Sequence, residues 1–218
     1  MPAQDLDEAF DLCDRDGVLS GQVKSRGSVH RDGDWHRALH LWVLVRGPGG
    51  PCVVLQRRSL AKDTHPGLVD VSVAGHLGAG ETVYDALREA EEEIGLAVSP
   101  ADTVLLGHRR VEKVVPVGVD REVQTVLATR CEQTLADLRP HPEEVAALYA
   151  PRLVEALALA RGDVPVIVAD RIDASGARGR GPLRAGDFIP GEEPYRRRCL
   201  ESLDALVRAS PFAVMRLE

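Results

Sequence analysis

A glycine-rich segment followed by a short acidic helix constrains this chain more than any other feature. Residues 75–81 read GHLGAGE, and residues 82–95 read TVYDALREAEEEIG. At about 100° per residue, the apolar residues of the second stretch form one stripe that can pack on a core. They are Val83, Ala86, Leu87, Ala90 and Ile94. Gly95 supplies a residue that can end a helix in the left-handed region, so the sequence predicts a helix over residues 82–94.

Three glutamates of this helix lie away from the apolar stripe. Glu89, Glu92 and Glu93 are three and four residues apart, so their carboxylates can converge, and Arg88 can pair with Glu92 one turn later. Six acids against one arginine in residues 81–95 repel one another. A hard divalent cation such as Mg²⁺, which prefers oxygen ligands, would offset that repulsion. A glutamate run alone more often forms a solvated helix face, so the metal hypothesis depends on the whole pattern.

The spacing of these residues closely resembles the Nudix box of diphosphate hydrolases. It reads Gly, five residues, Glu, and then Arg-Glu, two residues, Glu-Glu, one residue and Gly. The family pattern has seven residues between the loop glutamate and the arginine, whereas six separate Glu81 from Arg88 here. The helical half of the pattern is intact. The shortened segment therefore affects only the role expected of Glu81.

The resemblance implies both a fold and an activity. The fold is α+β, with a Nudix-type mixed β-sheet sandwiched between α-helices. The activity is that of a metal-dependent pyrophosphohydrolase, in which a metal-activated water attacks a diphosphate linked to another moiety, here a nucleoside di- or triphosphate or a derivative. The residues implied as ligands of Mg²⁺ or Mn²⁺ are Glu89, Glu92, Glu93 and the Gly75 carbonyl. Arg88 would orient Glu92 or Glu93.

Segments outside the box resemble the Nudix branch that includes isopentenyl-diphosphate isomerase and its hydrolase-like relatives. The segments are DRDG at 14–17, KSRG at 24–27, VH at 29–30, WHRA at 35–38, LQRR at 55–58, KD at 62–63, PG at 66–67 and AGH at 74–76. In the isomerase three histidines and two acids hold a divalent metal, and the matching residues are His30, His36, His76, Asp120 and Glu122. Such a set suits Mn²⁺ or Zn²⁺ better than Mg²⁺ alone, although a single histidine more often makes only a hydrogen bond.

One residue separates the isomerase from the hydrolases of this branch. The isomerase needs a cysteine immediately before the Gly-His pair, and that position is Ala74, whose methyl group cannot transfer a proton. Hydrolysis is therefore the expected reaction. Two alternatives stay open: an isomerase with an altered proton donor, and a non-catalytic nucleotide-binding sensor, which would have no need of the complete box.

The general base and the phosphate-binding residues are less constrained. The base could be a box glutamate, Glu122 or Glu144. Glu144 matches a late acidic position of the branch and is equally well interpreted as a charge at a helix N-terminus. Arg57, Arg58 and Lys62 are candidates for substrate binding, and the two arginines are equally typical of a basic strand end.

Composition narrows the partners and the compartment. The 218 residues carry a net charge of −7, which argues against a nucleic-acid polymer as partner. The partner that the resemblance implies is a small-molecule diphosphate. No apolar run approaches the length of a membrane span, and the first residues lack the organisation of a signal peptide. The four widely spaced cysteines are typical of reduced thiols, so we expect a cytoplasmic protein. Many proteins of this fold are dimers, and a homodimer is an open expectation.

The remaining pattern predicts a mixed sheet with helices on its faces. We expect a hairpin over 8–24 with its turn at 14–17, strands ending near Val45 and over 52–56, 68–74, 104–115, 122–129 and 164–169, helices over 143–160 and 195–207, and a loop over 174–186. These elements divide into a Nudix domain over 1–160, which includes the hairpin, and a C-terminal extension over 161–218 packed on the same domain.

Overall fold

The long strand β3 (Trp35–Gly47) organises the fold. The computed structural model describes residues 5–116 and 118–209. Within them β3 pairs in parallel with β9 (Gly118–Thr134) and antiparallel with three other strands, so that a seven-stranded mixed sheet forms around it. The other strands of this sheet are β1 (Ala9–Cys13), β2 (Leu19–Ser25), β4 (Gly50–Val53), β7 (Val73–His76) and β8 (Thr103–Val115).

Five further strands of the described chain form a second, antiparallel sheet in the order β12-β11-β10-β5-β6. They are β5 (Leu55–Arg58), β6 (Val69–Asp70), β10 (Val145–Ala150), β11 (Val166–Asp173) and β12 (Arg178–Arg184). Because β11 and β12 continue the sheet of β5 and β10, residues on both sides of position 160 share one sheet.

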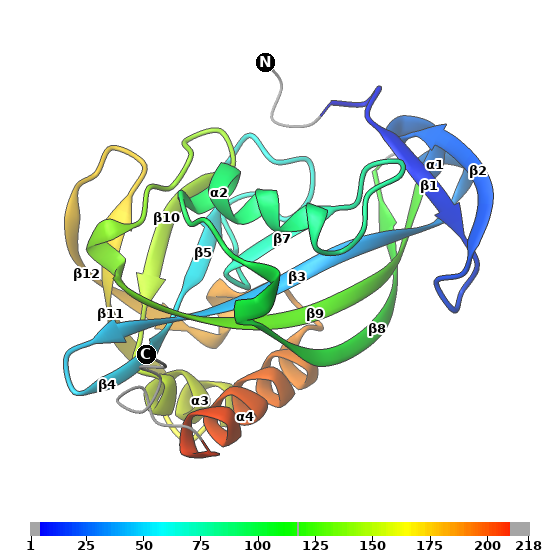
Figure 1. Cartoon of the computed structure of the whole chain (residues 1–218). Coiled ribbons are helices and arrows are strands. Elements are labelled where there is room, and N and C mark those ends of the chain that lie inside the picture. Colours follow the sequence, from blue (N-terminus) through cyan, green and yellow to red (C-terminus); the bar gives the residue numbers. More distant parts are fainter. Residues whose placement is uncertain (1–4, 117, 210–218) are drawn as a thin grey trace.

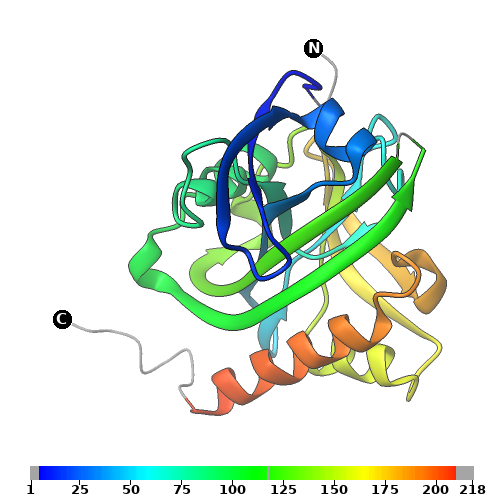
Figure 2. The same ribbon diagram turned by 90° about the vertical axis from the view of Figure 1, so that its right-hand side faces the viewer.

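Helices cover both faces of this strand assembly. They are α1 (Arg26–Asp32), α2 (Arg88–Ile94), α3 (Leu153–Arg161) and α4 (Glu193–Ala209). Figure 1 shows α2 on one side of β3 and β9, and α3 and α4 together on the other side. The view in Figure 2 shows α4 running along the underside of the sheet. The predicted α+β class, with sheet between helices, is confirmed.

Side chains on the two faces of β3 belong to two different hydrophobic cores. Leu39, Leu41 and Val43 are fully buried and pack with α2, whereas Trp42 and Leu44 belong to the core that contains α3 and α4. Successive side chains of a strand point to opposite faces, so one strand supports both layers. The packing of α2 on β3 fixes the box helix relative to the sheet.

The helix predicted over residues 82–94 is present in a shorter form. A 3₁₀ turn, Asp85–Leu87, precedes α2, and the expected apolar stripe packs on the core. Gly95 ends the helix in the left-handed region with φ of 71°, as predicted. A 3₁₀ turn rises about 2.0 Å per residue against about 1.5 Å for an α-helix, so it covers the same axial distance with fewer residues.

The N-terminal hairpin, the strands around 104–129 and the terminal helix lie where they were expected. Asp14 closes the hairpin turn by accepting hydrogen bonds from the amides of Asp16 and Val18. The expected strand over 68–74 is divided, because β6 and β7 belong to different sheets and the chain crosses between them at Ser72. The Ser72 hydroxyl donates to the Val54 carbonyl at 2.5 Å and accepts from the Val43 amide at 2.8 Å.

Two predicted elements are wrong. Residues 143–160 do not form one helix, because 145–150 form β10 between β5 and β11, and α3 starts only after Pro151. Residues 174–186 are not a loop, because 178–184 form β12 at the edge of the second sheet. Glycines and exposed arginines alternate there, which an edge strand tolerates.

The four cysteines are free thiols.

Candidate active site

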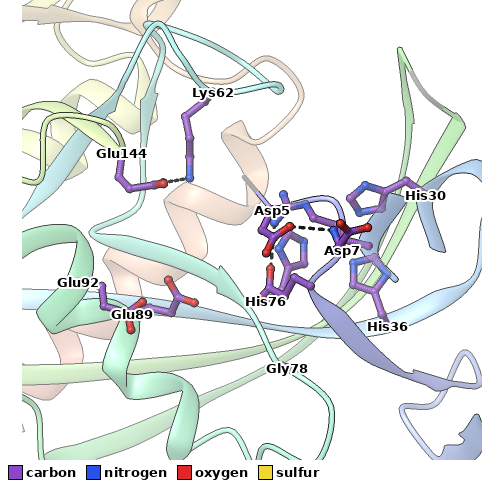
Figure 3. A network of polar contacts seen from close by, with 12 residues as sticks. Asp5, Asp7, His30, His36, Lys62, His76, Gly78, Glu89, Glu92 and Glu144 are labelled. Atoms are coloured by element: carbon purple, nitrogen blue, oxygen red, sulfur yellow. Dashed lines mark hydrogen bonds and ion pairs between the residues drawn. The ribbon is translucent and has the colours of Figure 1, made fainter. Parts of the chain in front are cut away.

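A cavity of about 860 Å³ is lined by residues of both clusters that the sequence singled out. At one end α2 contributes Glu89, Glu92 and Glu93, and at the other end lie His30 and His76, with His36 fully buried beside them. Figure 3 shows Glu89 and Glu92 on one side, opposite Lys62 and Glu144, with His30, His36 and His76 on the other side. The two ends are referred to below as the box end and the histidine end.

Glu93 is the most deeply buried carboxyl of the box end, with 2% of its surface exposed. Its Oε2 accepts hydrogen bonds from Gln56 Nε2 at 3.0 Å and from the Ala74 amide at 3.3 Å. Lys62 Nζ lies 4.0 Å from Oε1. Burial nevertheless raises the pKa of Glu93 to about 8, so its negative charge is incompletely compensated.

Glu89 packs directly on Gly75. A Cβ atom at position 75 would lie 2.5 Å from the Glu89 side chain, so glycine is needed for this close approach. Gly75, whose carbonyl is a ligand implied by the Nudix resemblance, is therefore within contact distance of Glu89. Burial raises the pKa of Glu89 to about 7, with the nearby Glu92 charge adding to the effect and Arg88 opposing it.

Arg88 connects the box glutamates to the preceding loop. Its Nη1 lies 2.8 Å from Glu89 Oε1 and 2.9 Å from Glu92 Oε2, so the predicted pairing with Glu92 is confirmed. Its Nε lies 2.8 Å from Glu81 Oε1, and the Gly78 amide donates to Glu81 Oε2 at 2.7 Å. In this conformation Glu81 holds the loop and Arg88. The Glu92 side chain is 56% exposed, so it reaches toward solvent at the rim.

The histidine end brings together residues from four elements: His30 of α1, His36 of β3, His76 of β7 and Asp120 of β9. One ligand atom from each of these four lies within 4.8 Å of the others. Glu122 Oε1 is 3.0 Å from His76 Nε2. All five residues implied by the resemblance to the isomerase branch are thus assembled.

Three polar atoms at this end have no hydrogen-bond partner among the described residues: His30 Nε2, His36 Nε2 and Asp120 Oδ1. Asp120 Oδ1 lies 3.7 Å from the first nitrogen and 3.5 Å from the second. Unpartnered buried polar atoms are costly, and here they converge on one point. This donor set fits a divalent cation.

The protonation states favour metal ligation at the histidine end. Burial lowers the pKa of His30 to about 4 and that of His76 to about 3, so both imidazoles are neutral near pH 7. Burial also raises the pKa of Asp120 to about 8, and the neighbouring Glu122 charge adds to this. Although burial opposes it, the hydrogen bond from His76 holds the pKa of Glu122 well below its usual range. Neutral imidazoles are the form that coordinates metals, and a bound cation would stabilise the ionised form of Asp120 that ligation requires.

The three basic residues that were candidates for substrate binding lie in different environments. Lys62 lines the cavity and forms an ion pair with Glu144. Arg58 also lines it, while its guanidinium is held by the Thr64 carbonyl at 2.9 Å and by Asp70 at 3.3 Å. Arg57 was a candidate for substrate binding, but its guanidinium donates to the Gly67 carbonyl at 2.8 Å and lies over the Tyr149 ring. It stabilises the β5 strand end and is outside the cavity lining that the described residues form.

Glu144 lines the cavity opposite α2, and 22% of its side chain is exposed. It belongs to the turn before β10, so the interpretation as a helix N-terminal charge is wrong, because no described helix begins there. Its ion pair with Lys62 turns the carboxylate inward. Of the two later candidates for the base, Glu144 is at the box end and Glu122 at the histidine end.

Sequence reasoning missed several polar residues of the cavity. They are His40, Lys113, Gln124 and Glu192, and the buried Gln56, which donates to Glu93, was missed as well. One signal was available, because His36, Ala38 and His40 alternate along β3 and must therefore share a face. Gln124 reaches the cavity through the pairing of β9 with β3, and Glu192 comes from the segment before α4, so neither placement is local in the sequence.

The comparison with protein families identifies this arrangement. The model of the NUDIX domain matches residues 36–168. The chain belongs to the Nudix family. Members of this hydrolase family act on acid anhydrides and cleave pyrophosphate bonds, so the chain is a hydrolase of that class.

Individual relatives agree with this assignment. A Nudix hydrolase of Clostridium acetobutylicum is 28% identical over 201 residues, which is 90% of this chain and 97% of the relative. An isopentenyl-diphosphate Δ-isomerase of Paenarthrobacter aurescens is 36% identical over 147 residues, 66% of this chain and 76% of the enzyme. A crystal structure of a Deinococcus radiodurans protein covers 88% of this chain and 99% of its own, with a TM-score of 0.57 and 22% identity, and shows the same fold.

These relatives also agree with the predicted position in the family, a Nudix branch similar to isopentenyl-diphosphate isomerase. None of the helices in the described ranges is long and apolar enough to cross a membrane.

Proposed function

We propose that this Nudix protein is a divalent-metal-dependent pyrophosphohydrolase. Its substrate is a diphosphate linked to a second group X, most simply a nucleoside di- or triphosphate or a derivative. One observation carries the proposal: Glu89 and Glu93 are buried carboxyls with raised pKa in a cavity that also contains Lys62 and Arg58. A bound cation stabilises the ionised form of such carboxyls, and the basic side chains suit a polyanionic substrate.

The donor atoms fit a divalent cation at both ends of the cavity. The box end supplies oxygen atoms, which Mg²⁺ and Mn²⁺ prefer. Its donors are Glu89, Glu92, Glu93 and the Gly75 carbonyl. The histidine end supplies the unpartnered atoms of His30, His36 and Asp120, a mixture that suits Mn²⁺ or Zn²⁺. When bound, such a cation neutralises charge on the diphosphate and lowers the pKa of a water.

The side chains around the box end have separable roles. Arg88 touches both Glu89 and Glu92 and fixes the direction of their carboxylates. Lys62 places a positive charge between Glu144 and Glu93. With Arg58 it forms the basic side of the cavity and supports binding of the phosphoryl oxygens.

We assign the general base to Glu144. The box glutamates are the proposed metal ligands. The other later candidate, Glu122, is engaged by His76 and by the Gln124 amide, and its low pKa makes it a weak base. Glu144 faces the box end, and Lys62 holds its carboxylate in place. A water between Glu144 and the substrate would lose its proton to this carboxylate as it attacks phosphorus.

Hydrolysis is favoured over the two alternatives. Ala74 lines the cavity at the position where the isomerase branch requires a cysteine, and it offers no transferable proton. A sensor needs only affinity for its ligand, whereas this chain retains Arg88 and the three box glutamates in mutual contact or within one cavity.

The test is hydrolysis of a panel of nucleoside diphosphates, nucleoside triphosphates, sugar nucleotides and isopentenyl diphosphate, first with Mg²⁺ and then with Mn²⁺. Glu93→Gln should reduce turnover at least ~100-fold, since it removes a charge from the box end. Glu91→Gln is the matched control, because Glu91 is an exposed residue of the same helix. Silence of the wild type across the panel, with ligand still bound, would support a sensor, and proton exchange into isopentenyl diphosphate would support an isomerase.

A further inference from the structure

The cavity floor between its two ends is formed by neighbouring strands with unusually small side chains at two positions. Ala38 lies beside Gln124 in the parallel pairing of β3 and β9, and His40 lies opposite Ala74 in the antiparallel pairing of β3 and β7. All four residues line the cavity. The two alanines leave open floor, and His40 and Gln124 are the polar groups at its margin.

Gln124 presents an unused acceptor to this space. Its side chain is buried, with 2% exposed, and its amide nitrogen donates to Glu122. Because the amide nitrogen donates to the Glu122 carboxylate, the amide oxygen points the other way. That oxygen has no hydrogen-bond partner among the described residues. A ligand hydroxyl would satisfy it.

His40 presents the complementary donor. Its Nδ1 lies 2.9 Å from the Tyr195 hydroxyl oxygen, which also accepts a hydrogen bond from Trp42 Nε1 at 3.3 Å. The Tyr195 proton is therefore available to Nδ1, a better acceptor than the Cys199 sulfur that also contacts Tyr195. Burial lowers the pKa of His40 and raises that of Tyr195, so both are neutral. The His40 proton then resides on Nε2, the nitrogen left for a molecule in the cavity.

We propose that His40 and Gln124 are specificity-determining residues that bind the hydroxyl groups of a ribosyl X group, a conclusion that rests on the proposed hydrolase function. A donor and an acceptor on the lining of one cavity match the hydroxyl groups of a sugar, which both accept and donate. A hydrocarbon X group would leave both side chains unpaired, and sites built around such groups reject analogues that lack the hydroxyl. Among the described residues that line the cavity, none is Phe, Tyr or Trp, so recognition falls on the sugar rather than on stacking of a base.

The experiment measures binding of a non-hydrolysable nucleotide, α,β-methylene-ADP, and of its 2′,3′-dideoxy form, by calorimetry in the presence of Mg²⁺. The wild type should bind the ribose form at least ~10-fold more tightly, as expected for one or two hydrogen bonds. Gln124→Met and His40→Leu should each reduce this ratio toward one. Gln22→Met is the matched control, because Gln22 is exposed on β2, and it should preserve the ratio.

Binding does not require turnover, so the outcome is independent of the hydrolase assay. Equal affinity of the wild type for both analogues, or no binding of either, would overturn the proposal, as would a ratio that survives both substitutions. Circular dichroism and thermal unfolding verify that each variant is folded. If His40→Leu does not fold, Tyr195→Phe tests the same donor, because it removes the hydroxyl that fixes the His40 tautomer and should also lower the ratio.

Discussion

Gly75 and Glu89 approach so closely that a Cβ atom at position 75 would lie 2.5 Å from the Glu89 carboxyl carbon. Gly75→Ala should therefore displace this carboxylate while leaving the strand paired. We expect kcat to fall roughly 10- to 100-fold, since a shift of about 1 Å in a catalytic group has effects of this size. Gly179→Ala is the control, because a Cβ there meets nothing within 4 Å. An unchanged kcat for Gly75→Ala would remove Glu89 from the catalytic set.

Lys62 lies within ion-pair distance of two carboxylates, those of Glu144 and Glu93. Lys62→Met removes the charge and keeps most of the apolar stem, so we expect kcat to fall roughly 10- to 100-fold, as for residues that orient a metal or base. Lys24→Met is matched in chemistry, since Lys24 forms ion pairs with Asp32 and Asp34 in another part of the molecule. Steady-state kinetics of both variants test this role. A rise in KM with unchanged kcat would mean that Lys62 binds phosphate but does not orient the carboxylates.

Features that are local in the sequence were predictable, and features made by distant pairing were not. The apolar stripe of α2, its end at Gly95 and the Arg88–Glu92 pair depend on residues within one or two turns. The joining of His30 and Asp120 depends on β9 running beside β3, and only the family resemblance indicated it.

The wrong elements have the same cause. Residues 145–150 are apolar throughout and are compatible with helix or strand; pairing with β5 and β11 selects the strand. The Arg-Gly tract becomes β12 only because β11 offers a free edge. Gln124 lies beside Ala38, two residues along β3 from His40, through the parallel register of β3 and β9, which no spacing in the sequence reveals.

Stability should depend on pH through Glu192. Burial opposes it, but hydrogen bonds and ion pairs from Arg109 at 2.5 Å and Lys113 at 2.7 Å lower its pKa from 4.5 to about 2. A depressed pKa contributes stability above the unfolded value, and this contribution is lost as pH falls from 4.5 toward 2. Glu192→Gln should thus lower the urea midpoint clearly at pH 6 and little at pH 2.5. Glu132→Gln, whose side chain is 65% exposed, should change it little at either pH.

The packing of α2 should be measurable separately from its chemistry. Ile94 is fully buried beneath the helix, and Ile94→Ala should lower the free energy of unfolding by about 2–5 kcal/mol. Val114 is 90% exposed, so Val114→Ala should change it by less than ~0.5 kcal/mol. Urea unfolding followed by circular dichroism checks both. A small effect of Ile94→Ala would mean that α2 is not anchored by this core.

The two ends of the cavity should bind separate cations, because they use different side chains, and β7 is the strand that contributes to both, through Gly75 and His76. A cation that binds only the folded chain raises stability by about 2.7 kcal/mol at 100 times its Kd. Mn²⁺ should therefore raise the melting temperature of the wild type, and EDTA should reverse the rise. His36→Gln should remove the part contributed by the histidine end, and Glu93→Gln the part contributed by the box end. Calorimetric stoichiometry should fall by one site in each variant, and loss of all binding in a single variant would mean that the ends form one site.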